Sequence, residues 1–356
     1  MNNILVIALG KSEGGCGLYA VEIIKRLSIN HNVTVFKSTF SKLNWSDVNK
    51  KVKINNVITY HNKFELILSS FFIYPFVLCY IFTKLLFNKY DALYVPYFHP
   101  WECTIVRLFK LFKKKVVYTV HDGIMHYGDE NKTQERMQFY SMKNSTNVVF
   151  LTEYVRDLVL AKCSTSAMIH VIPHGVFRLT GINRCKPRKK KLSILFMGRI
   201  SKYKGVELLL QAISMFNTDS IEEIVIAGKS NYNIIWKKHN LLHIIDKWLT
   251  EKEIINILND SDIMVLPYLE ATQSGIATLA IDAQIPLVCT DVGGLKEQIG
   301  EAGIFVEANA KSIADGINMM LENVELFHDM QQKLRLRREV LTWDIISSKI
   351  ENIFLN

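Results

Sequence analysis

The stretch that decides the fold runs from Leu192 to Ala212 and has the sequence LSILFMGRISKYKGVELLLQA. Its first six residues form an apolar run of the length of a buried β-strand. Gly198 ends this run, a polar loop follows, and from Gly205 onward the apolar residues recur at the spacing of an α-helix. The stretch therefore predicts a strand, a loop and a helix, which is the repeating unit of a parallel α/β sheet.

The loop contains two cations, Arg199 and Lys204, five residues apart. Ligands of α/β proteins commonly bind where a loop leaves the C-terminal end of a parallel strand and leads into a helix. A planar guanidinium and a mobile ammonium at such a loop suit a diphosphate. On the residues alone, two hydrated cations on a surface loop are the more ordinary interpretation.

The rest of the chain repeats the same alternation of strands and helices. With 356 residues, 49% of them hydrophobic and 22% charged, the chain has the length of about two globular α/β domains. Short runs rich in apolar residues predict buried parallel strands, and the run at 4–9 is uninterrupted. These runs lie at residues 4–9, 32–36, 92–95, 116–120, 148–152, 192–197, 223–228 and 263–267.

The phrase G-R-x-x-x-x-K-G at residues 198–205 resembles the phosphate-binding motif in the second domain of family 4 glycosyltransferases. Further similar phrases are His121-Asp122 after a strand, V-I-P-H-G-V at 171–176, and the stretch 268–297. The resemblance implies the α/β GT-B fold, in which two Rossmann-like domains face each other across a cleft. Residues 1–180 would form the acceptor domain and residues 190–342 the nucleotide-sugar domain, with a helix at 343–356 packing back on the first domain.

The resemblance also implies roles for individual residues. Arg199 and Lys204 match the positions that neutralise the leaving nucleoside diphosphate, and no metal is required for this role. His121 matches the histidine beside the donor sugar, whereas His126 is equally an ordinary loop histidine. The remaining donor-binding positions implied by the resemblance are Gly14, Gly15, Gly198, Thr272, Gln273, Ser274 and Gly275.

One departure from the family pattern concerns two glutamates that many members carry with seven residues between them. Here Glu270 is followed eight positions later by Thr278, and alignment on Gly275 instead puts Thr272 and Ala280 at these places. The Q-S-G wording is seen in a branch of the family, so we interpret the departure as variation. We expect Glu270 to contact the donor sugar, with Thr272 as the alternative, and the contact to the ribose stays open.

The charge is unevenly distributed. Residues 1–180 hold 22 Lys and Arg against 12 Asp and Glu, whereas residues 181–356 hold 21 against 22. A basic first half suggests nucleic acid, an anionic membrane or a phosphorylated substrate as partner. No nucleic-acid-binding module is recognisable in the sequence, so we expect no nucleic acid as partner. We expect the partners to be a membrane and a phosphorylated acceptor.

Residues 66–83, LILSSFFIYPFVLCYIFT, contain no charge and reach the length of a membrane span. We reject a span because predicted strands of one sheet lie on both sides of the segment and because Pro75 interrupts it. Two interpretations stay open: a buried helix, or a helix in the bilayer interface. The basic, amphipathic stretch with Lys110, Lys113 and Lys114 favours the interface, although a hydrated helix end explains these lysines as well.

Several patterns argue against other kinds of site. The six cysteines show no C-x-x-C spacing, which argues against disulfides and zinc and for a reducing cytoplasm. Residues 1–3 run directly into the predicted strand at 4–9, so we expect no secretory leader. Asp260 and Asp262 resemble a metal-binding D-x-D motif, but we expect a structural role for Asp262. The basic segment 184–191 lacks periodicity and predicts a hydrated interdomain linker.

The resemblance implies a retaining, metal-independent glycosyltransferase without a cofactor, and the basic, apolar first half of the chain favours a location at the cytoplasmic face of the inner membrane. It would transfer a sugar from a UDP- or GDP-sugar to a hydroxyl of a lipid-pyrophosphate-linked saccharide in bacterial O-antigen or capsule synthesis. One alternative is a nucleotide-sugar epimerase or phosphorylase of the same fold, for which we find no separate acid–base set. Another is a non-catalytic scaffold, against which the intact Arg199 and Lys204 argue.

Overall fold

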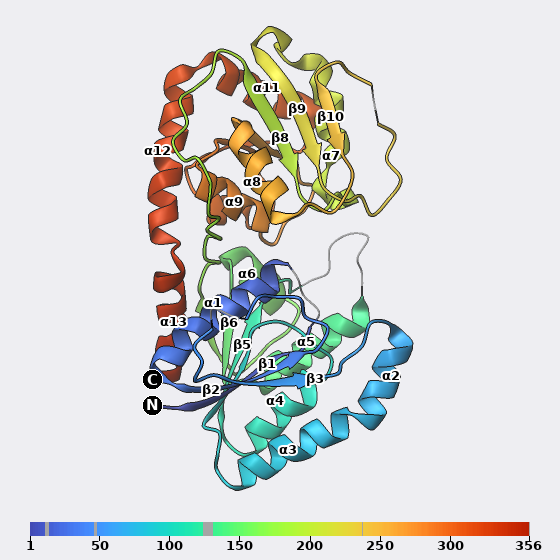
Figure 1. The fold of residues 1–356 in the computed structure, drawn as a ribbon, viewed down its shortest axis with the longest axis vertical. Coiled ribbons are helices and arrows are strands. Elements are labelled where there is room, and N and C mark those ends of the chain that lie inside the picture. Colours follow the sequence, from blue (N-terminus) through green and yellow to red (C-terminus); the bar gives the residue numbers. More distant parts are fainter. Residues whose placement is uncertain (11–13, 46–47, 124–130, 237, 356) are drawn as a thin grey trace. The chain divides into compact units, whose positions relative to one another are not determined.

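The computed structural model describes residues 1–10, 14–45, 48–123, 131–236 and 238–355. Within these residues the chain forms two compact α/β units (Figure 1). Unit 1 contains the chain up to His174 together with the C-terminal segment from Trp343, and unit 2 contains Gly175–Thr342. Each unit is built on a parallel sheet with helices around it, which confirms the predicted α/β class.

In the described part of unit 1, seven parallel strands pair in the order β3-β2-β1-β4-β5-β6-β7. The central strands coincide with the predicted apolar runs, whereas β3 and β7 were not predicted. Both lie at sheet edges and are only partly buried, so their sequences lack an uninterrupted apolar run. The strands are β1 Asn3–Ala8, β2 Asn32–Ser38, β3 Lys53–Val57, β4 Ala92–Val95, β5 Lys115–Val120, β6 Asn147–Phe150 and β7 Met168–Val171.

Through the described residues of unit 2, six parallel strands pair in the order β10-β9-β8-β11-β12-β13. The edge strands β10 and β13 are again the partly buried ones. The strands are β8 Leu192–Met197, β9 Ile221–Ala227, β10 Leu242–Ile245, β11 Ile263–Leu266, β12 Leu287–Thr290 and β13 Gly303–Val306.

Polar side chains fix the first turn of many of the helices. Asn62, Thr152, Thr250, Ser274 and Asn309 each accept a hydrogen bond from the backbone N–H three residues later. The helices of unit 1 are α1 Gly15–Asn30, α2 Lys63–Phe72, α3 Tyr74–Leu86, α4 Glu102–Leu111, α5 Lys132–Asn144, α6 Glu153–Leu160 and α13 Trp343–Leu355. Those of unit 2 are α7 Val206–Ala212, α8 Glu251–Asp260, α9 Gly275–Ala283, α10 Leu295–Ile299, α11 Ala310–Glu322 and α12 Val324–Val340.

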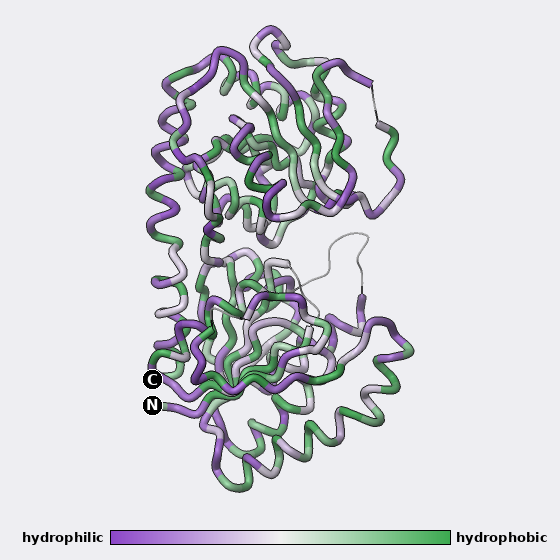
Figure 2. Tube along the Cα trace, in the orientation of Figure 1, coloured by the Kyte–Doolittle hydropathy of each residue, from purple (hydrophilic) through white to green (hydrophobic). Residues whose placement is uncertain are grey.

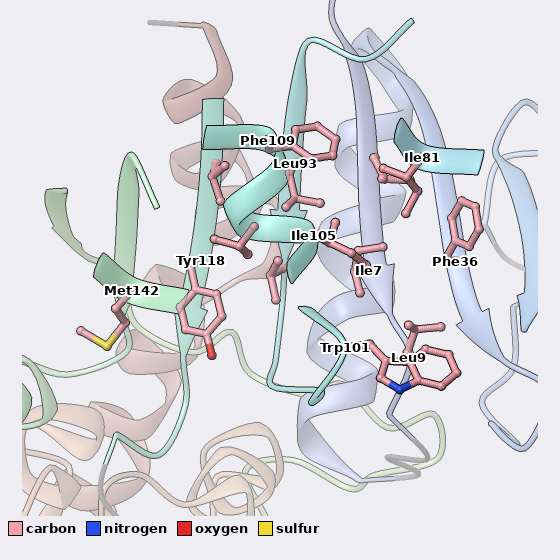
Figure 3. Close-up of a cluster of buried hydrophobic side chains, with 14 of the residues drawn as sticks. Ile7, Leu9, Phe36, Ile81, Leu93, Trp101, Ile105, Phe109, Tyr118 and Met142 are labelled. Carbon is pink, nitrogen blue, oxygen red and sulfur yellow. The ribbon is translucent and has the colours of Figure 1, made fainter. Parts of the chain in front are cut away.

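The core of unit 1 lies between its sheet and the helices α3 and α4 (Figure 3). Leu93 and Tyr118 of the sheet meet Ile105 and Phe109 of α4 and Ile81 of α3, and all of these side chains are at most 1% exposed. Strands covered on both faces must be apolar throughout, which is why the central strands were predictable.

The C-terminal helix α13 packs on α1 within unit 1. Glu351 accepts hydrogen bonds from Arg26 Nε at 2.9 Å and from Asn30 Nδ2 at 2.7 Å. Lys115 Nζ donates to the carbonyl of Ile353 at 2.9 Å. These polar contacts tie the end of the chain to the first helix and to β5.

The basic segment before β8 is not simply hydrated, so that prediction was wrong for several of its residues. Lys186 Nζ donates to the carbonyls of Leu258 and Asn259 at the C-terminal end of α8. Arg188 donates to the carbonyl of Leu321 at the end of α11, and Arg184 forms an ion pair with Asp282 at 2.9 Å. Cations stabilise helix C-termini because these carbonyls have no partner within the helix.

The uncharged segment 66–83 forms most of two helices, α2 and α3, which meet at Ile73. Pro75 stands in the first turn of α3, where a proline is tolerated. In the described part of the chain no single helix is long and apolar enough to cross a membrane, although α2 and α3, bent by 45°, together pass that test by length and composition. The alternative of a buried helix was wrong for α2, because most of its large apolar side chains are exposed, whereas α3 buries Val77, Ile81 and Leu85 along one face.

Candidate active site

The strand order of unit 2 reverses between β8 and β11, since β9 and β10 lie on one side of this pair and β12 and β13 on the other. In open parallel sheets, ligands commonly bind at the carboxyl ends of the two strands where the order reverses, here β8 and β11. The β8 loop carries Arg199 and Lys204. The β11 loop carries residues 267–274 and leads into α9.

Lys204 connects these two loops. It lies in a short 3-10 turn and is 9% exposed. Its Nζ donates to the hydroxyl of Tyr268 at 3.1 Å and stands 4.9 Å from the centroid of the same ring. The Tyr268 hydroxyl in turn lies 3.1 Å from Ser274 Oγ, which accepts from the N–H of Ala277 in the first turn of α9. The ammonium is thus linked to a helix N-terminus, where anions bind favourably.

The charge of Lys204 is poorly compensated within unit 2. Burial is the main cause that lowers its pKa, and the positive charge of Arg199 lowers it further, while Tyr203 acts in the opposite direction. In the part of the chain that the structure describes, no carboxylate forms an ion pair with Lys204. Because a buried charge without a counter-ion is unfavourable, the site is set up to receive an anion.

Two glycines allow the loops to approach so closely. Gly205 has φ +63°, and a Cβ at this position would lie 2.0 Å from the carbonyl oxygen of Pro267. Gly198 has φ +113°, and its Cβ would lie 2.9 Å from Ile276 and 3.2 Å from Lys204 Nζ. The glycines of the motif are therefore required both by left-handed backbone and by lack of space.

The sugar loop predicted from the sequence lies on the same side of the sheet as Lys204. Glu270 is exposed, whereas Thr272 and Ser274 are buried and Gln273 is half-buried. The side chain of Gln298 fixes Ser274, because it accepts from the Ser274 N–H at 2.8 Å and donates to the Ser274 carbonyl at 2.9 Å. At Gly275 a Cβ would meet nothing within 4 Å, so the start of α9 is open.

Two residues of this arrangement were not predicted from the sequence. Tyr268 directly follows Leu266-Pro267 at the end of a predicted strand, and this position at the carboxyl end of a parallel strand could have indicated it. Gln298 lies in the short helix α10, and nothing in the sequence distinguishes it from a surface residue.

His121 lies in unit 1, one residue after β5, and is 6% exposed. Its Nε2 is 2.9 Å from the carbonyl oxygen of Pro96, which follows β4. Burial is the largest influence on its pKa and lowers it, against smaller opposing contributions from Asp122 and Pro96. The imidazole is therefore neutral near pH 7, with the proton on Nε2 where it donates to Pro96.

Aromatic rings surround His121. The ring of Tyr19 on α1 stands at 85° to it, with 4.8 Å between centroids, and the ring of His174 lies 6.4 Å away. Trp343, the first residue of α13, contacts both Tyr19 and His174. The V-I-P-H-G-V phrase thus contributes a histidine to the packing around His121, a role that the sequence did not indicate.

Gly14 and Gly15 lie at the start of α1, with Gly14 as the residue before its first turn. A Cβ on Gly14 would meet nothing within 4 Å, so close packing does not explain this glycine. Burial and the nearby charge of Asp122 raise the pKa of Cys16 to about 12, which places the end of β5 near the start of α1. His126 lies outside the described residues.

The structure therefore groups the predicted residues in two sets. Unit 2 brings together Gly198, Arg199, Lys204, Glu270, Thr272, Gln273, Ser274 and Gly275. Unit 1 holds Gly14, Gly15 and His121.

No group of three or more His, Cys, Asp or Glu side chains that could hold a metal ion occurs among the described residues. Asp262 of the D-x-D phrase is buried and accepts from the Ser193 N–H at 2.9 Å. Its second contact is an ion pair with Lys189 at 3.3 Å. These contacts fasten β11 to β8 and agree with the structural role expected for Asp262.

Comparison with known families matches both halves of the chain. Residues 13–177 match the model "Glycosyltransferase Family 4", and residues 191–323 match the model "Glycosyl transferases group 1". The chain is a family 4-like glycosyltransferase of the GT-B type. The predicted GT-B fold is thereby confirmed.

Relatives of this glycosyltransferase include an uncharacterised 41.2 kDa protein in the cps region of Klebsiella pneumoniae, 25% identical over 69% of this chain and 68% of that protein. An uncharacterised glycosyltransferase of Methanocaldococcus jannaschii is 22% identical over 75% of each chain.

Solved structures share the fold over almost the whole chain. Anabaena HepE in complex with UDP has a TM-score of 0.77 at 14% identity, covering 99% of both chains. WaaG, a glycosyltransferase involved in lipopolysaccharide biosynthesis, has a TM-score of 0.67 at 13% identity, again covering 99% of both chains.

The desolvated ammonium leads to a prediction about the ligand-free glycosyltransferase. Replacing Lys204 with Met keeps the length of the side chain and removes the buried charge, so we expect the melting temperature without ligand to rise. Differential scanning calorimetry of the wild type and Lys204→Met would measure this.

Lys202→Met, at an exposed lysine of the same turn, is the matched control and should leave the melting temperature nearly unchanged. A clear fall in the melting temperature of Lys204→Met alone would mean that Lys204 stabilises the fold, against the account given above.

Proposed function

We propose that this glycosyltransferase transfers a sugar from a nucleoside-diphosphate sugar to a hydroxyl of a lipid-pyrophosphate-linked saccharide, with retention at the anomeric carbon. The observation that carries the proposal is the buried ammonium of Lys204, which has an exposed guanidinium, Arg199, on the same loop and faces the start of α9. A diphosphate supplies the negative charge that this place lacks.

The cations would act most strongly when the bond between the sugar and the diphosphate breaks. At that stage negative charge builds up on the leaving oxygen, and positive groups already in position stabilise it without reorganisation. Lys204 is held by Tyr268, which is held in turn by Ser274, so its position does not depend on the ligand. Arg199 is exposed and has the planar donors that suit a phosphate.

The open start of α9 is suited to the sugar. Gly275 leaves this helix terminus accessible, and the exposed carboxylate of Glu270 and the hydroxyl of Thr272 lie on the loop that precedes it. Free backbone N–H groups and a carboxylate together match the donor and acceptor character of sugar hydroxyls. We assign Glu270 the contact with the donor sugar.

In unit 1, His121 would lie beside the donor sugar, as the family resemblance implies. Its neutral imidazole offers a polar edge without adding charge near the leaving group. The proton of the acceptor hydroxyl would pass to the leaving phosphate itself, so no separate general base is needed. The two cations would take the place of a metal ion in the diphosphate site.

The nature of donor and acceptor rests on further observations. HepE is known in complexes with UDP and with UDP-glucose, which favours UDP over GDP as the carrier of the donor sugar. The basic first half of the chain favours a phosphorylated acceptor at an anionic membrane. Relatives in a cps region and in lipopolysaccharide synthesis favour a role in O-antigen or capsule assembly at the cytoplasmic face of the inner membrane.

The assignment of the two cations predicts the effect of removing them. Arg199→Ala and Lys204→Ala should each lower turnover at least about 100-fold, as is typical when one preorganised group at a developing charge is lost. Turnover would be measured with a panel of nucleotide sugars and membrane-extracted lipid acceptor, and product stereochemistry by nuclear magnetic resonance.

Lys202→Ala, at the exposed lysine of the same loop, serves as the control and should keep turnover within a few-fold of the wild type. Wild-type activity in Arg199→Ala or Lys204→Ala would refute the diphosphate site. If the sugar is epimerised but not transferred, the protein is an epimerase. If the sugar is transferred to free phosphate, it is a phosphorylase. If no donor reacts, it is a non-catalytic scaffold.

The sugar loop yields a second prediction, which compares Glu270 with Thr272. A charged hydrogen bond contributes about 2–3 kcal/mol and a neutral one about 1 kcal/mol, so Glu270→Gln should slow transfer about 30-fold or more and Thr272→Val only about fivefold. Rates would be measured at saturating donor, alongside melting temperatures that show whether both variants are folded. If Thr272→Val is the slower enzyme, Thr272 contacts the sugar and our assignment of Glu270 is wrong.

A further inference from the structure

Helix α2 presents its apolar residues to the outside. Phe64, Ile67, Leu68 and Phe71 recur at the spacing of one helix face, and together with Phe72 they are between 41% and 75% exposed. Within this helix, all of which is described, the buried residue is Ser69. An apolar stripe at this spacing normally faces a protein core, so its exposure indicates a partner that is absent from the isolated chain.

Helix α3 continues this surface and anchors it. Val77, Ile81 and Leu85 recur every four residues and pack into the core of unit 1. The helix also exposes large apolar side chains, of which Phe76 is 77% exposed. Phe87, just beyond the helix, is 70% exposed. Figure 2 shows the resulting run of hydrophobic residues along α2 and α3.

The segment that carries the exposed apolar residues is rich in cations. Between residues 63 and 115 the chain has eight Lys and Arg residues against three acidic residues. One of the three, Glu102, is fully buried, and burial raises its pKa to about 8, so it adds little negative charge at neutral pH. The cations are Lys63, Lys84, Lys89, Arg107, Lys110, Lys113, Lys114 and Lys115.

An apolar groove of about 420 Å³ between α3 and α4 extends the surface. Its lining includes Pro75, Leu78 and Phe82 on α3 and Leu108 and Leu111 on α4. Arg107 also lines it and keeps its guanidinium in contact with Asn144 Oδ1 at 3.1 Å. The groove is mostly apolar and has one cation, Arg107, in its lining, which matches a hydrocarbon chain that carries a negatively charged head.

We propose that the outer face of α2 and α3 is the surface with which the protein docks on an anionic lipid bilayer. Phe71, Phe72 and Phe76 insert among the lipid chains, and the surrounding lysines contact lipid phosphates. The inference rests on the membrane location in the proposed function and goes further by naming the inserted residues. A basic rim complements anionic lipid, whereas a two-fold contact between two copies would bring this rim against itself.

The test uses sedimentation with vesicles of phosphatidylethanolamine and phosphatidylglycerol, and with vesicles of phosphatidylcholine alone. We expect the wild type to bind the anionic vesicles, less tightly at high salt. Two variants should each bind the anionic vesicles at least about tenfold more weakly than the wild type. They are the double variant Phe71→Ser, Phe76→Ser and the triple variant Lys110→Ser, Lys113→Ser, Lys114→Ser.

Matched controls change exposed residues of unit 2. Ile235→Ser with Trp248→Ser, and Lys190→Ser, Lys191→Ser with Lys311→Ser, should leave binding unchanged. If these controls weaken binding as much as the variants of α2 to α4, the proposed surface is wrong.

Insertion has its own readout. Phe71→Trp should gain fluorescence that brominated lipids quench, beyond the quenching of the native tryptophans, because the indole would lie among the lipid chains. Absence of extra quenching would overturn insertion. A second result would also overturn it: the wild type does not bind vesicles but forms a dimer in analytical ultracentrifugation, and the variant Phe71→Ser, Phe76→Ser is a monomer.

Failure of this proposal is distinguishable from failure of the proposed function. Thermal stabilisation by UDP or UDP-glucose reports on unit 2 and should be the same in all of these variants. If the wild type is stabilised by the nucleotide but does not bind anionic vesicles, the docking surface is overturned and the diphosphate site stands.

Discussion

The candidate site depends on one contact, the buried ammonium of Lys204 against the hydroxyl of Tyr268. This contact exists because two loops meet at the point where the strand order reverses, and the loops can meet because Gly205 has no Cβ, which would lie against the carbonyl of Pro267. The cost of burying the charge is the physical basis of the site, since a charge that the fold leaves uncompensated favours any anion able to reach it.

Unit 1 uses the same sheet geometry with a different electrostatic result. Its strand order reverses between β1 and β4, and next to this point His121 is buried against the carbonyl of Pro96 and the ring of Tyr19. Burial keeps this imidazole neutral, whereas Lys204 keeps a proton that its surroundings disfavour. Unit 1 thus contributes a neutral polar side chain at this position, and unit 2 contributes a positively charged one.

The sequence was sufficient for the parts of the molecule that a local pattern determines. Central strands such as β1 and β8 are covered on both faces and must be apolar throughout, and the loop of Arg199 and Lys204 has fixed spacing. Edge strands such as β3 were not predicted, because they are partly exposed to water and their sequences are therefore not apolar throughout. The contact of Tyr268 with Lys204 and the helix-capping role of Lys186 were not predicted, because the partners lie 64 and 72 residues away in the chain. No local sequence pattern indicates such contacts.

The central claim is that Lys204 binds the second phosphate of a nucleoside diphosphate. The most direct test is isothermal titration of UDP and UMP, and of GDP and GMP, into the wild type and Lys204→Met. The account predicts that the wild type binds the diphosphate of its own nucleobase at least about tenfold more tightly than the monophosphate, the contribution expected of one charged hydrogen bond, and that Lys204→Met loses this preference. An equal preference in both proteins would contradict the account.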